Sequence, residues 1–229
     1  DRDLATHLMR TDLLRRGRGL SAATAQLAGA LGIRHKVVPM SDDPVRTRVT
    51  TDVGDLDFQD YFVRRQCQPR VAALRFAGVE AAVPTAQVCA ALTAPDVDAI
   101  IICPSNPYLS IDPILALPGI RELLKQASAP VLAISPLVGG AAVKGPTAKI
   151  MAELGISVSP LAVARHYGDL LDGFVLDVRD AAVEAELCEL GLPTLVTDTL
   201  MKTLDDRKRL AAETLAYALT LGKRKAARA

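Results

Sequence analysis

The sequence has few cysteines and no metal-binding spacing among them. Its four cysteines, at positions 67, 89, 103 and 188, form no CxxC pair, and the three histidines lie far from them along the chain. Zinc sites usually bring cysteine and histidine ligands together at short, regular spacings. The pattern argues against a zinc site and favours reduced, mostly buried thiols, as in a cytoplasmic protein.

The chain also lacks a surplus of either charge. It carries 27 lysines and arginines against 26 aspartates and glutamates, a net charge of +1. Proteins that bind nucleic acid or anionic membranes usually show a basic surplus. The longest apolar stretch, residues 129–143, is interrupted by proline, serine and glycine and is unsuited to spanning a membrane. We therefore expect neither nucleic acid nor a membrane as partner.

Three common catalytic or nucleotide-binding fingerprints are missing. No GxGxxG follows a predicted strand, which weakens an NAD or FAD interpretation. No GxSxG occurs, which disfavours an α/β-hydrolase. The GxxxxGK[ST] spacing of a P-loop is absent as well. His166, which stands beside Tyr167, is more often a packed histidine than a base in such a setting.

What the sequence does contain is an alternation of short apolar runs with segments of helical spacing. The runs predicted as strands are residues 35–40, 46–51, 71–78, 98–104, 129–136, 173–180 and 193–200. The segments predicted as helices are residues 118–127, 145–155, 160–171, 180–191 and 205–224. This alternation predicts a single α/β domain over residues 1–229, a three-layer, Rossmann-like fold with a mostly parallel sheet. Residues 41–66 are predicted to form a small insertion or edge subdomain that contains a hairpin.

Ligands of open α/β sheets bind beyond the carboxyl ends of the strands, and three loops that follow predicted strands have unusual compositions. In the first, Ser105, Asn106 and Ser110 stand among prolines and could surround phosphate oxygens. A proline-stiffened turn explains the same residues equally well. In the second, Gly139 and Gly140 allow close backbone approach, and Lys144 with Gly145 precedes a helix. An anion clamp is possible there, although a flexible loop with a solvated lysine is slightly favoured.

A third loop, residues 39–49, is charged. Asp42 and Asp43 could contribute to a divalent-ion site, and Arg46 and Arg48 could meet a phosphate. A charged turn closed by Asp-Pro is the more ordinary explanation.

Seven segments, taken in order, strongly resemble the 2-phospho-L-lactate and phosphoenolpyruvate transferase family of deazaflavin coenzyme (F-420) biosynthesis. They are residues 1–17, 40–65, 78–88, 100–124, 131–151, 164–181 and 196–201. The resemblance implies transfer of a phospho-acid group, derived from phosphoenolpyruvate or 2-phospholactate, from a guanosine diphospho donor to the ribityl hydroxyl of the deazaflavin precursor Fo. GMP is released, Mg²⁺ assists, and the protein is expected to be a cytoplasmic homodimer.

The resemblance also assigns Ser105, Asn106, Ser110 and Lys144 to contacts with the donor nucleotide or its phosphates, with the glycine-rich loop lining the same site. The alternative is a non-catalytic nucleotide- or nucleotide-sugar-binding regulator on the same fold. The family pattern starts upstream of Asp1, with a strand and aspartates that help bind the metal. We therefore expect the chain to lack its first sheet strand and most of its metal site, and a polypeptide starting at Asp1 to be inactive.

Overall fold

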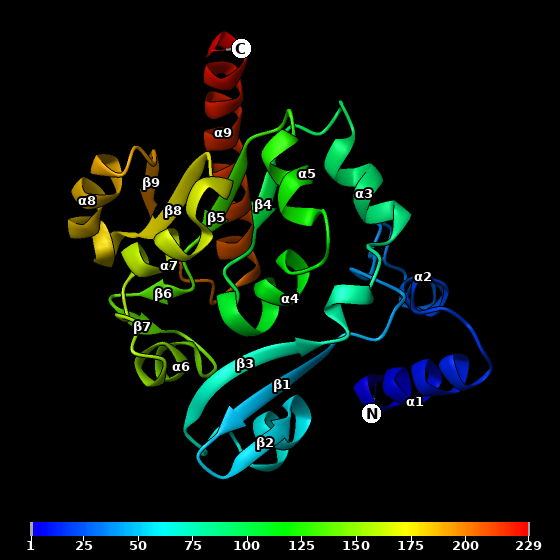
Figure 1. The fold of residues 1–229 in the computed structure, drawn as a ribbon. Coiled ribbons are helices and arrows are strands. Elements are labelled where there is room, and N and C mark those ends of the chain that lie inside the picture. The colour runs from blue at the N-terminus through cyan, green and yellow to red at the C-terminus, as the bar shows by residue number, and fades with distance from the viewer. Residues whose placement is uncertain (1, 229) are drawn as a thin grey trace.

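A four-stranded parallel sheet organises the molecule. The computed structural model describes residues 2–228, with side chains described as far as residue 222. The sheet has the order β4-β5-β8-β9, and every neighbouring pair is parallel (Figure 1). Its strands are β4 (Ile100–Ile102), β5 (Val131–Ile134), β8 (Gly173–Asp177) and β9 (Thr194–Thr197). The predicted α/β architecture with a parallel sheet is confirmed.

Both faces of this sheet are covered, which gives the fold its three layers. Successive strand side chains point to opposite faces. Leu132, Ile134 and Val175 pack against residues of the last helix, α9 (Leu204–Arg228). Val131 and Phe174, one residue out of phase, lie in the main core with the helices of the opposite face. Strands buried on both faces read as continuous apolar runs, which is why β5 and β8 could be recognised in the sequence.

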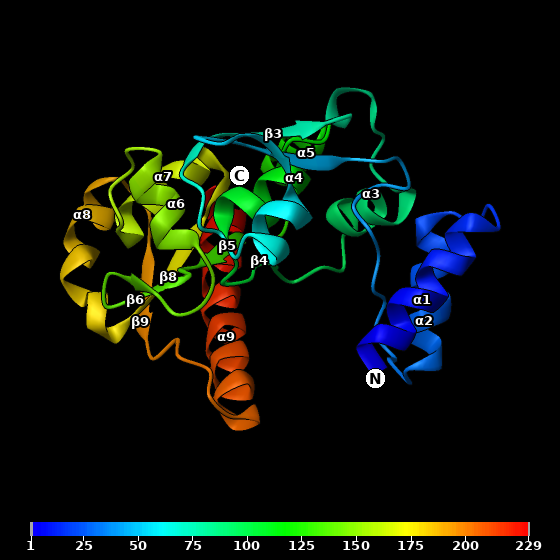
Figure 2. The same cartoon turned by 90° about the horizontal axis from the view of Figure 1, so that it is seen from below.

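The remaining helices are mostly short. They are α1 (Arg2–Arg15), α2 (Leu20–Ala30), α3 (Ala86–Thr93), α4 (Asp112–Leu115), α5 (Ile120–Gln126), α6 (Thr147–Glu153), α7 (Pro160–Tyr167) and α8 (Glu184–Glu189). The 3₁₀ segments are Val79–Ala81, Gly168–Leu170 and Val178–Val183, and the π-helical turns are Asp60–Arg64 and Pro107–Ile111. Figure 2 shows α1 and α2 together at one side of the molecule, away from the parallel sheet. No helix within the described chain is long and apolar enough to cross a membrane.

A second, antiparallel sheet has the order β2-β1-β3. Its strands are β1 (Arg46–Thr51), β2 (Gly54–Asp57) and β3 (Val71–Ala77), and it packs on the main core through Val49 and Leu56. The predicted hairpin is therefore present, but the sheet takes in residues 71–77, beyond the predicted end of the insertion at residue 66. Whether residues 41–66 form a separate subdomain stays a prediction.

One predicted strand is wrong. Residues 35–40 form no strand, and the nearest pairing is an isolated bridge between Ser41 and Pro84. Val37 and Val38 remain exposed. A β-branched run forms a strand only where a neighbouring strand supplies a ladder and a surface to pack on, and the described chain places none beside these residues.

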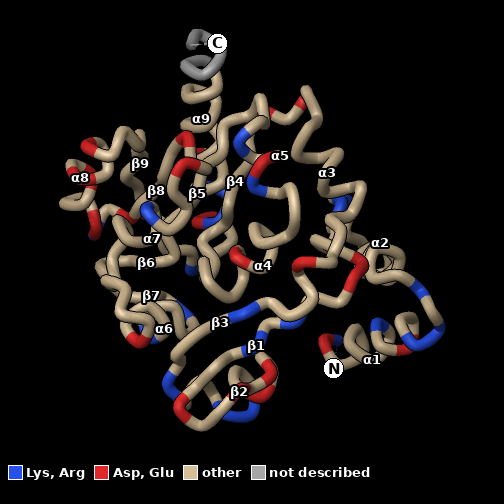
Figure 3. The backbone as a smooth tube through the Cα atoms, in the orientation of Figure 1, with Lys and Arg blue, Asp and Glu red and all other residues tan. Residues whose placement is uncertain are grey.

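Charged residues are spread over the whole fold. Figure 3 shows lysines and arginines interspersed with aspartates and glutamates on most elements. Several of these charges form exposed pairs, such as the one between Arg75 and Asp55 on the small sheet. This distribution agrees with the balanced charge of the sequence.

Candidate functional site

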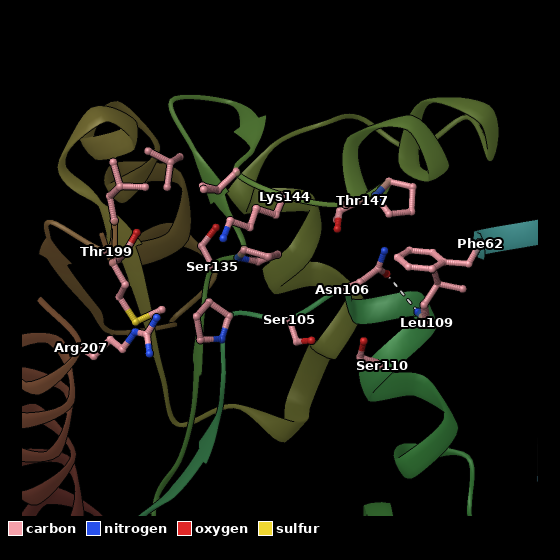
Figure 4. A pocket seen from close by; sticks show the side chains of 18 of the residues that line it. Phe62, Ser105, Asn106, Leu109, Ser110, Ser135, Lys144, Thr147, Thr199 and Arg207 are labelled. Atoms are coloured by element: carbon pink, nitrogen blue, oxygen red, sulfur yellow. Dashed lines mark hydrogen bonds between the residues drawn. The ribbon is translucent and has the colours of Figure 1, made fainter. Parts of the chain in front are cut away.

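A cavity of about 650 Å³ opens at the carboxyl ends of the parallel strands. Parallel strands all end at the same edge of a sheet, so the loops that follow them meet there. The cavity is lined by the loops after β4, β5 and β9, by the start of α9, and by Phe58 and Phe62 of the segment that follows β2 (Figure 4). Its size suits a single small-molecule ligand.

The loop after β4 carries Ser105 and Asn106 into the cavity wall. Asn106 precedes the turn that begins at Pro107, and its Oδ1 accepts hydrogen bonds from the N–H groups of Tyr108 and Leu109, both at 3.0 Å. The asparagine therefore acts as an N-cap. Ser110, on the same turn, also lines the cavity. The loop is therefore a stiff capped turn that also forms part of the cavity wall. Its contact with phosphate oxygens stays a prediction.

The loop after β5 begins with a buried serine and continues into a tight hairpin. Ser135 Oγ closes a turn by accepting from Leu137 N–H at 3.2 Å. The hairpin pairs β6 (Leu137–Val138) with β7 (Ala141–Ala142) across Gly139-Gly140, whose φ angles are 61° and 70°. Two consecutive positive φ angles are typical of a type I′ turn, which glycine adopts readily. The hairpin leads directly to Lys144 and Gly145, which both line the cavity.

Asp180 holds this hairpin in place. Its carboxylate accepts from the N–H groups of Gly139 and Gly140, each at 2.8 Å. These two donors are therefore already occupied, and neither glycine lines the cavity. In the structure these glycines form the turn that leads to Lys144. The predicted close approach of a ligand to them stays a prediction.

Asp177, at the end of β8, orders the opposite wall. It is 0% exposed, and its Oδ2 accepts from the N–H and the hydroxyl of Thr199, which lines the cavity. Its Oδ1 accepts from Arg179 N–H at 3.0 Å and from the Arg179 guanidinium at 2.9 Å. Burial by itself would raise the pKa of Asp177, but the hydrogen bonds from Arg179 and Thr199 together lower the pKa below its usual value.

Two cations face the cavity without a carboxylate partner. Lys144 comes from the loop after β7, and Arg207 from the first turn of α9. Within the described residues neither forms an ion pair, and the cavity lining includes no aspartate or glutamate. Other arginines nearby are paired, as Arg209 is with Glu213 at 2.9 Å. Unpaired cations at a cavity from which carboxylates are absent favour an anionic ligand.

An aromatic wall lies at the other side of the cavity. Phe58 and Phe62 are stacked, with ring centroids 5.3 Å apart and 24° between the ring planes. Phe62 is 41% exposed although it is a large apolar side chain. In Figure 4 Phe62 and Arg207 appear at opposite sides of the view, with Lys144 between them. The cavity is thus apolar and aromatic at one end and cationic at the other.

The structure brings together some of the predicted site residues and separates others. Those that line the cavity are Ser105, Asn106, Ser110, Lys144 and Gly145. The third predicted loop is elsewhere. Asp42 accepts from Ser21 N–H at the start of α2, and Asp43 accepts from Val83 N–H at 2.8 Å. Arg46 begins β1 and is exposed, and Arg48 pairs with Asp57. Their predicted phosphate and metal contacts stay untested.

Candidate metal ligands do not gather in one cluster within the part of the chain that the structure describes. The described chain contains no group of three or more histidines, cysteines, aspartates or glutamates placed to hold a metal ion. Asp112 and His166 lie 2.7 Å apart, yet this pair stands alone between α4 and α7 and outside the cavity lining. The predicted upstream metal ligands concern residues before Asp1, outside the described residues.

Several lining residues were not predicted from the sequence. They are Phe58, Phe62, Ser135, Thr147, Thr199 and Arg207. Ser135 and Thr199 each follow a strand of the parallel sheet closely, so the rule that directed attention to Ser105 could have identified them. Arg207 gave no such signal, because it stands in a helix rich in charged residues.

The chain matches a protein-family model described as 2-phospho-L-lactate transferase CofD over residues 1–217. It is 42% identical over 211 residues to a 2-phospho-L-lactate transferase of Methanosarcina mazei, covering 92% of this chain and 68% of that protein. It is 38% identical over 223 residues to a phosphoenolpyruvate transferase of Streptomyces griseus, covering 95% of this chain and 70% of that protein.

Solved structures share the fold at much lower identity. A crystal structure of a UPF0052-family protein from Bacillus halodurans superposes with a TM-score of 0.58 at 17% identity, covering 86% of this chain and 66% of that one. A second structure from the same organism gives a TM-score of 0.61 at 16% identity, covering 91% of this chain and 70% of that one. At such identities the likeness concerns the fold alone.

Proposed function

Because the chain belongs to the 2-phospho-L-lactate transferase CofD family, we propose that it transfers a phospho-acid group from a guanosine diphospho donor to the deazaflavin precursor Fo. The acid is derived from phosphoenolpyruvate or 2-phospholactate. Relatives of both names match at similar identity and coverage. The two acids differ at one small group, which side-chain types alone discriminate weakly.

In this reaction the terminal ribityl hydroxyl of Fo attacks the phosphorus that carries the acid. The new P–O bond gives a phosphodiester, the bond from that phosphorus to the bridging oxygen breaks, and the bridging oxygen leaves with GMP. The hydroxyl proton passes to solvent. Phosphoryl transfer of this kind depends mainly on positioning and on neutralising phosphate charge.

The observation that supports this proposal is that two cations line the cavity without a carboxylate partner among the described residues. Lys144 and Arg207 reach one cavity from different elements, and no carboxylate on its described lining competes for them. In the proposed complex they contact the donor phosphates and offset the charge that develops on the departing GMP. Asp180 and Asp177 position the surrounding loops through Gly139, Gly140 and Thr199.

A magnesium requirement is expected from the family. The described residues contain no group of three or more metal-ligating side chains, and magnesium commonly binds through one or two carboxylates together with substrate phosphates. The roles above are therefore derived for the chain's own side chains. The homodimer and the cytoplasmic location likewise stay predictions.

The test is an activity assay of the complete gene product with Fo and each candidate donor, with the product identified by mass. We expect a phosphodiester of Fo together with GMP, and an activity reduced at least about tenfold in Lys144→Ala. Absence of product with every donor would contradict the proposal. The rival regulator would bind nucleotide without changing Fo fluorescence on titration, whereas the transferase must bind Fo.

A further inference from the structure

The aromatic wall of the cavity and the cation Lys144 come from distant parts of the chain. Phe58 and Phe62 belong to the segment that follows β2, whereas Lys144 leads into α6. In the view of Figure 4, Thr147, the first residue of α6, appears between Lys144 and Phe62. A ligand that contacts both the aromatic wall and Lys144 requires a fixed distance between them, so the contacts that join the two segments help to determine what the cavity accepts.

These two segments are joined where α6 lies beside the start of β3 (Figure 1). Glu153 Oε2 accepts a hydrogen bond from Val71 N–H at 2.9 Å. Lys149 Nζ donates to the carbonyl oxygen of Pro69, also at 2.9 Å. The two side chains pair with each other at 2.5 Å. One turn of α6 therefore holds two backbone groups that lie 82 and 80 residues away along the chain.

Lys149 and Glu153, together called the α6 clamp, are partly shielded from solvent. Their side chains are 34% and 18% exposed. A fully exposed ion pair contributes little, because water and salt screen it. Here each charge also satisfies a backbone group, and hydrogen bonds of charged groups are stronger than those of neutral ones. Loss of either side chain would remove the partner of one backbone group and of the other charge.

The α6 clamp reaches the aromatic wall through a short segment with an unusual backbone. Tyr61, which precedes Phe62, is 0% exposed, and Lys149 Nζ lies 6.0 Å from the centroid of its ring. Farther along, Gln66 and Cys67 have φ angles of 48° and 58°, in the left-handed region that residues other than glycine rarely adopt. Such conformations persist where the surrounding structure holds them, and the α6 clamp holds the end of this segment.

We propose that Lys149 and Glu153 are positioning residues, which fix the aromatic wall relative to Lys144 and so set the span of the ligand that the cavity accepts. Neither is among the lining residues of the cavity, so they act through the backbone that they hold. This role rests on the proposed function for the choice of the ligands that test it, whereas the link between α6 and the aromatic wall does not depend on the reaction.

Hydrogen–deuterium exchange of the protein without ligand tests whether the α6 clamp holds the aromatic wall. In Lys149→Met, the backbone amides of residues 58–65 should exchange about tenfold faster, and those of β8 should change much less. Lys125→Met is the matched control. It removes the pair of Lys125 with Asp169, 2.7 Å apart and outside the cavity lining, and should leave residues 58–65 unchanged. An equal acceleration in β8, or one confined to α6 and residues 69–71, would overturn the inference.

Ligand binding provides the second test. GDP and Fo each carry a planar ring that can reach the aromatic wall, whereas pyrophosphate carries only the charge that Lys144 and Arg207 attract. Lys149→Met should weaken binding of at least one of the two ring-bearing ligands about tenfold, with GDP measured by calorimetry and Fo by its fluorescence. Pyrophosphate affinity should stay within about twofold of the wild type. Lys149→Arg keeps the donor to Pro69 and the pair with Glu153, so it should restore both exchange and affinity.

The possible results separate the positioning role from the proposed function. Unchanged binding of both ring-bearing ligands, or an equal loss of pyrophosphate affinity, contradicts the positioning role while the proposed function stands. The same loss in Lys149→Arg as in Lys149→Met also contradicts it, because the clamp contacts are then not what matters. A wild type that binds neither GDP nor Fo overturns the proposed function, and the exchange measurements then decide by themselves whether the α6 clamp holds the aromatic wall.

Discussion

The carboxylate of Asp180 accepts a hydrogen bond from the N–H of Gly140 at 2.8 Å, 40 residues away along the chain. A second bond of the same length joins it to Gly139. A residue that follows the third strand of the parallel sheet thereby fixes the loop that follows the second. Since this loop continues to Lys144, the position of a cavity cation depends on a carboxylate that does not line the cavity.

Removal of the Asp180 carboxylate should loosen this loop. Asp180→Ala leaves two backbone donors without their acceptor, and we expect a loss of about 1–3 kcal/mol in the free energy of unfolding, measured by urea denaturation. GDP affinity should fall as well, because Lys144 is no longer held. Glu189→Ala, at an exposed position on α8, is the matched control and should change neither quantity. If Asp180→Ala is destabilised but binds GDP as tightly as the wild type does, the hairpin of β6 and β7 does not position the binding site.

Gly78 should resist substitution. Its φ is 90°, and a Cβ atom built on it would lie 2.6 Å from the carbonyl oxygen of Pro44. The atom that a Cβ would meet belongs to the backbone and not to a flexible side chain. Gly78→Ala should therefore lower the free energy of unfolding by about 1–3 kcal/mol. Gly29→Ala is the control. Gly29 has ordinary helical geometry in α2 with open space around it, so alanine there should be neutral or stabilising. Equal melting temperatures for the two variants would contradict the argument.

The sequence predicts those features of the fold that depend on residues close together in the chain. β5 and β8 were predictable because burial on both faces makes their sequences continuously apolar. Residues 35–40 have a similar local composition but no neighbouring strand, and local sequence does not reveal a missing neighbour. Gly139 and Gly140 correctly indicated an unusual loop. Their structural role, a turn whose N–H groups donate to Asp180, depends on a residue 40 positions away in the chain.

The same limit applies to the candidate site. Ser105 and Asn106 could be predicted because they directly follow a strand of the sheet. Arg207 could not, since Arg207, Lys208 and Arg209 are adjacent cations in α9. Which of them faces the cavity depends on the rotation of the helix against the sheet. That rotation is set by packing of Leu210 and Ala218 on the strands.

Asp177 should make the protein acid-sensitive. Hydrogen bonds hold its pKa below the usual value despite burial, so in the unfolded state, where the pKa is about 3.9, it binds a proton more readily. Its contribution to stability is therefore complete above about pH 5 and is lost as the pH falls through the native pKa. The difference in unfolding free energy between wild type and Asp177→Asn should shrink across that range. A difference that stays constant across that range would contradict the assignment.

Arg207 and its neighbour Lys208 offer a direct test of the cationic end of the cavity. Arg207 lines the cavity and is unpaired within the described residues, whereas Lys208, the next residue of α9, lies near Asp205 at 3.6 Å and is largely exposed. Both substitutions to alanine remove one positive charge from the same helix turn, so they alter the net charge equally. Arg207→Ala should weaken GDP binding about tenfold at low salt, while Lys208→Ala should change it little.

The salt dependence of GDP binding distinguishes a direct phosphate contact by Arg207 from a general effect of positive charge on α9. If Arg207 contacts a donor phosphate, GDP binding by Arg207→Ala should also be less sensitive to added salt. Salt weakens the attraction between Arg207 and the phosphate, and the variant lacks that attraction. The measurement is the GDP dissociation constant of wild type and both variants across a salt series. If Arg207→Ala and Lys208→Ala weaken binding alike and with the same salt dependence, α9 contributes only overall positive charge. The phosphates of the donor would then have to be placed against Lys144 alone.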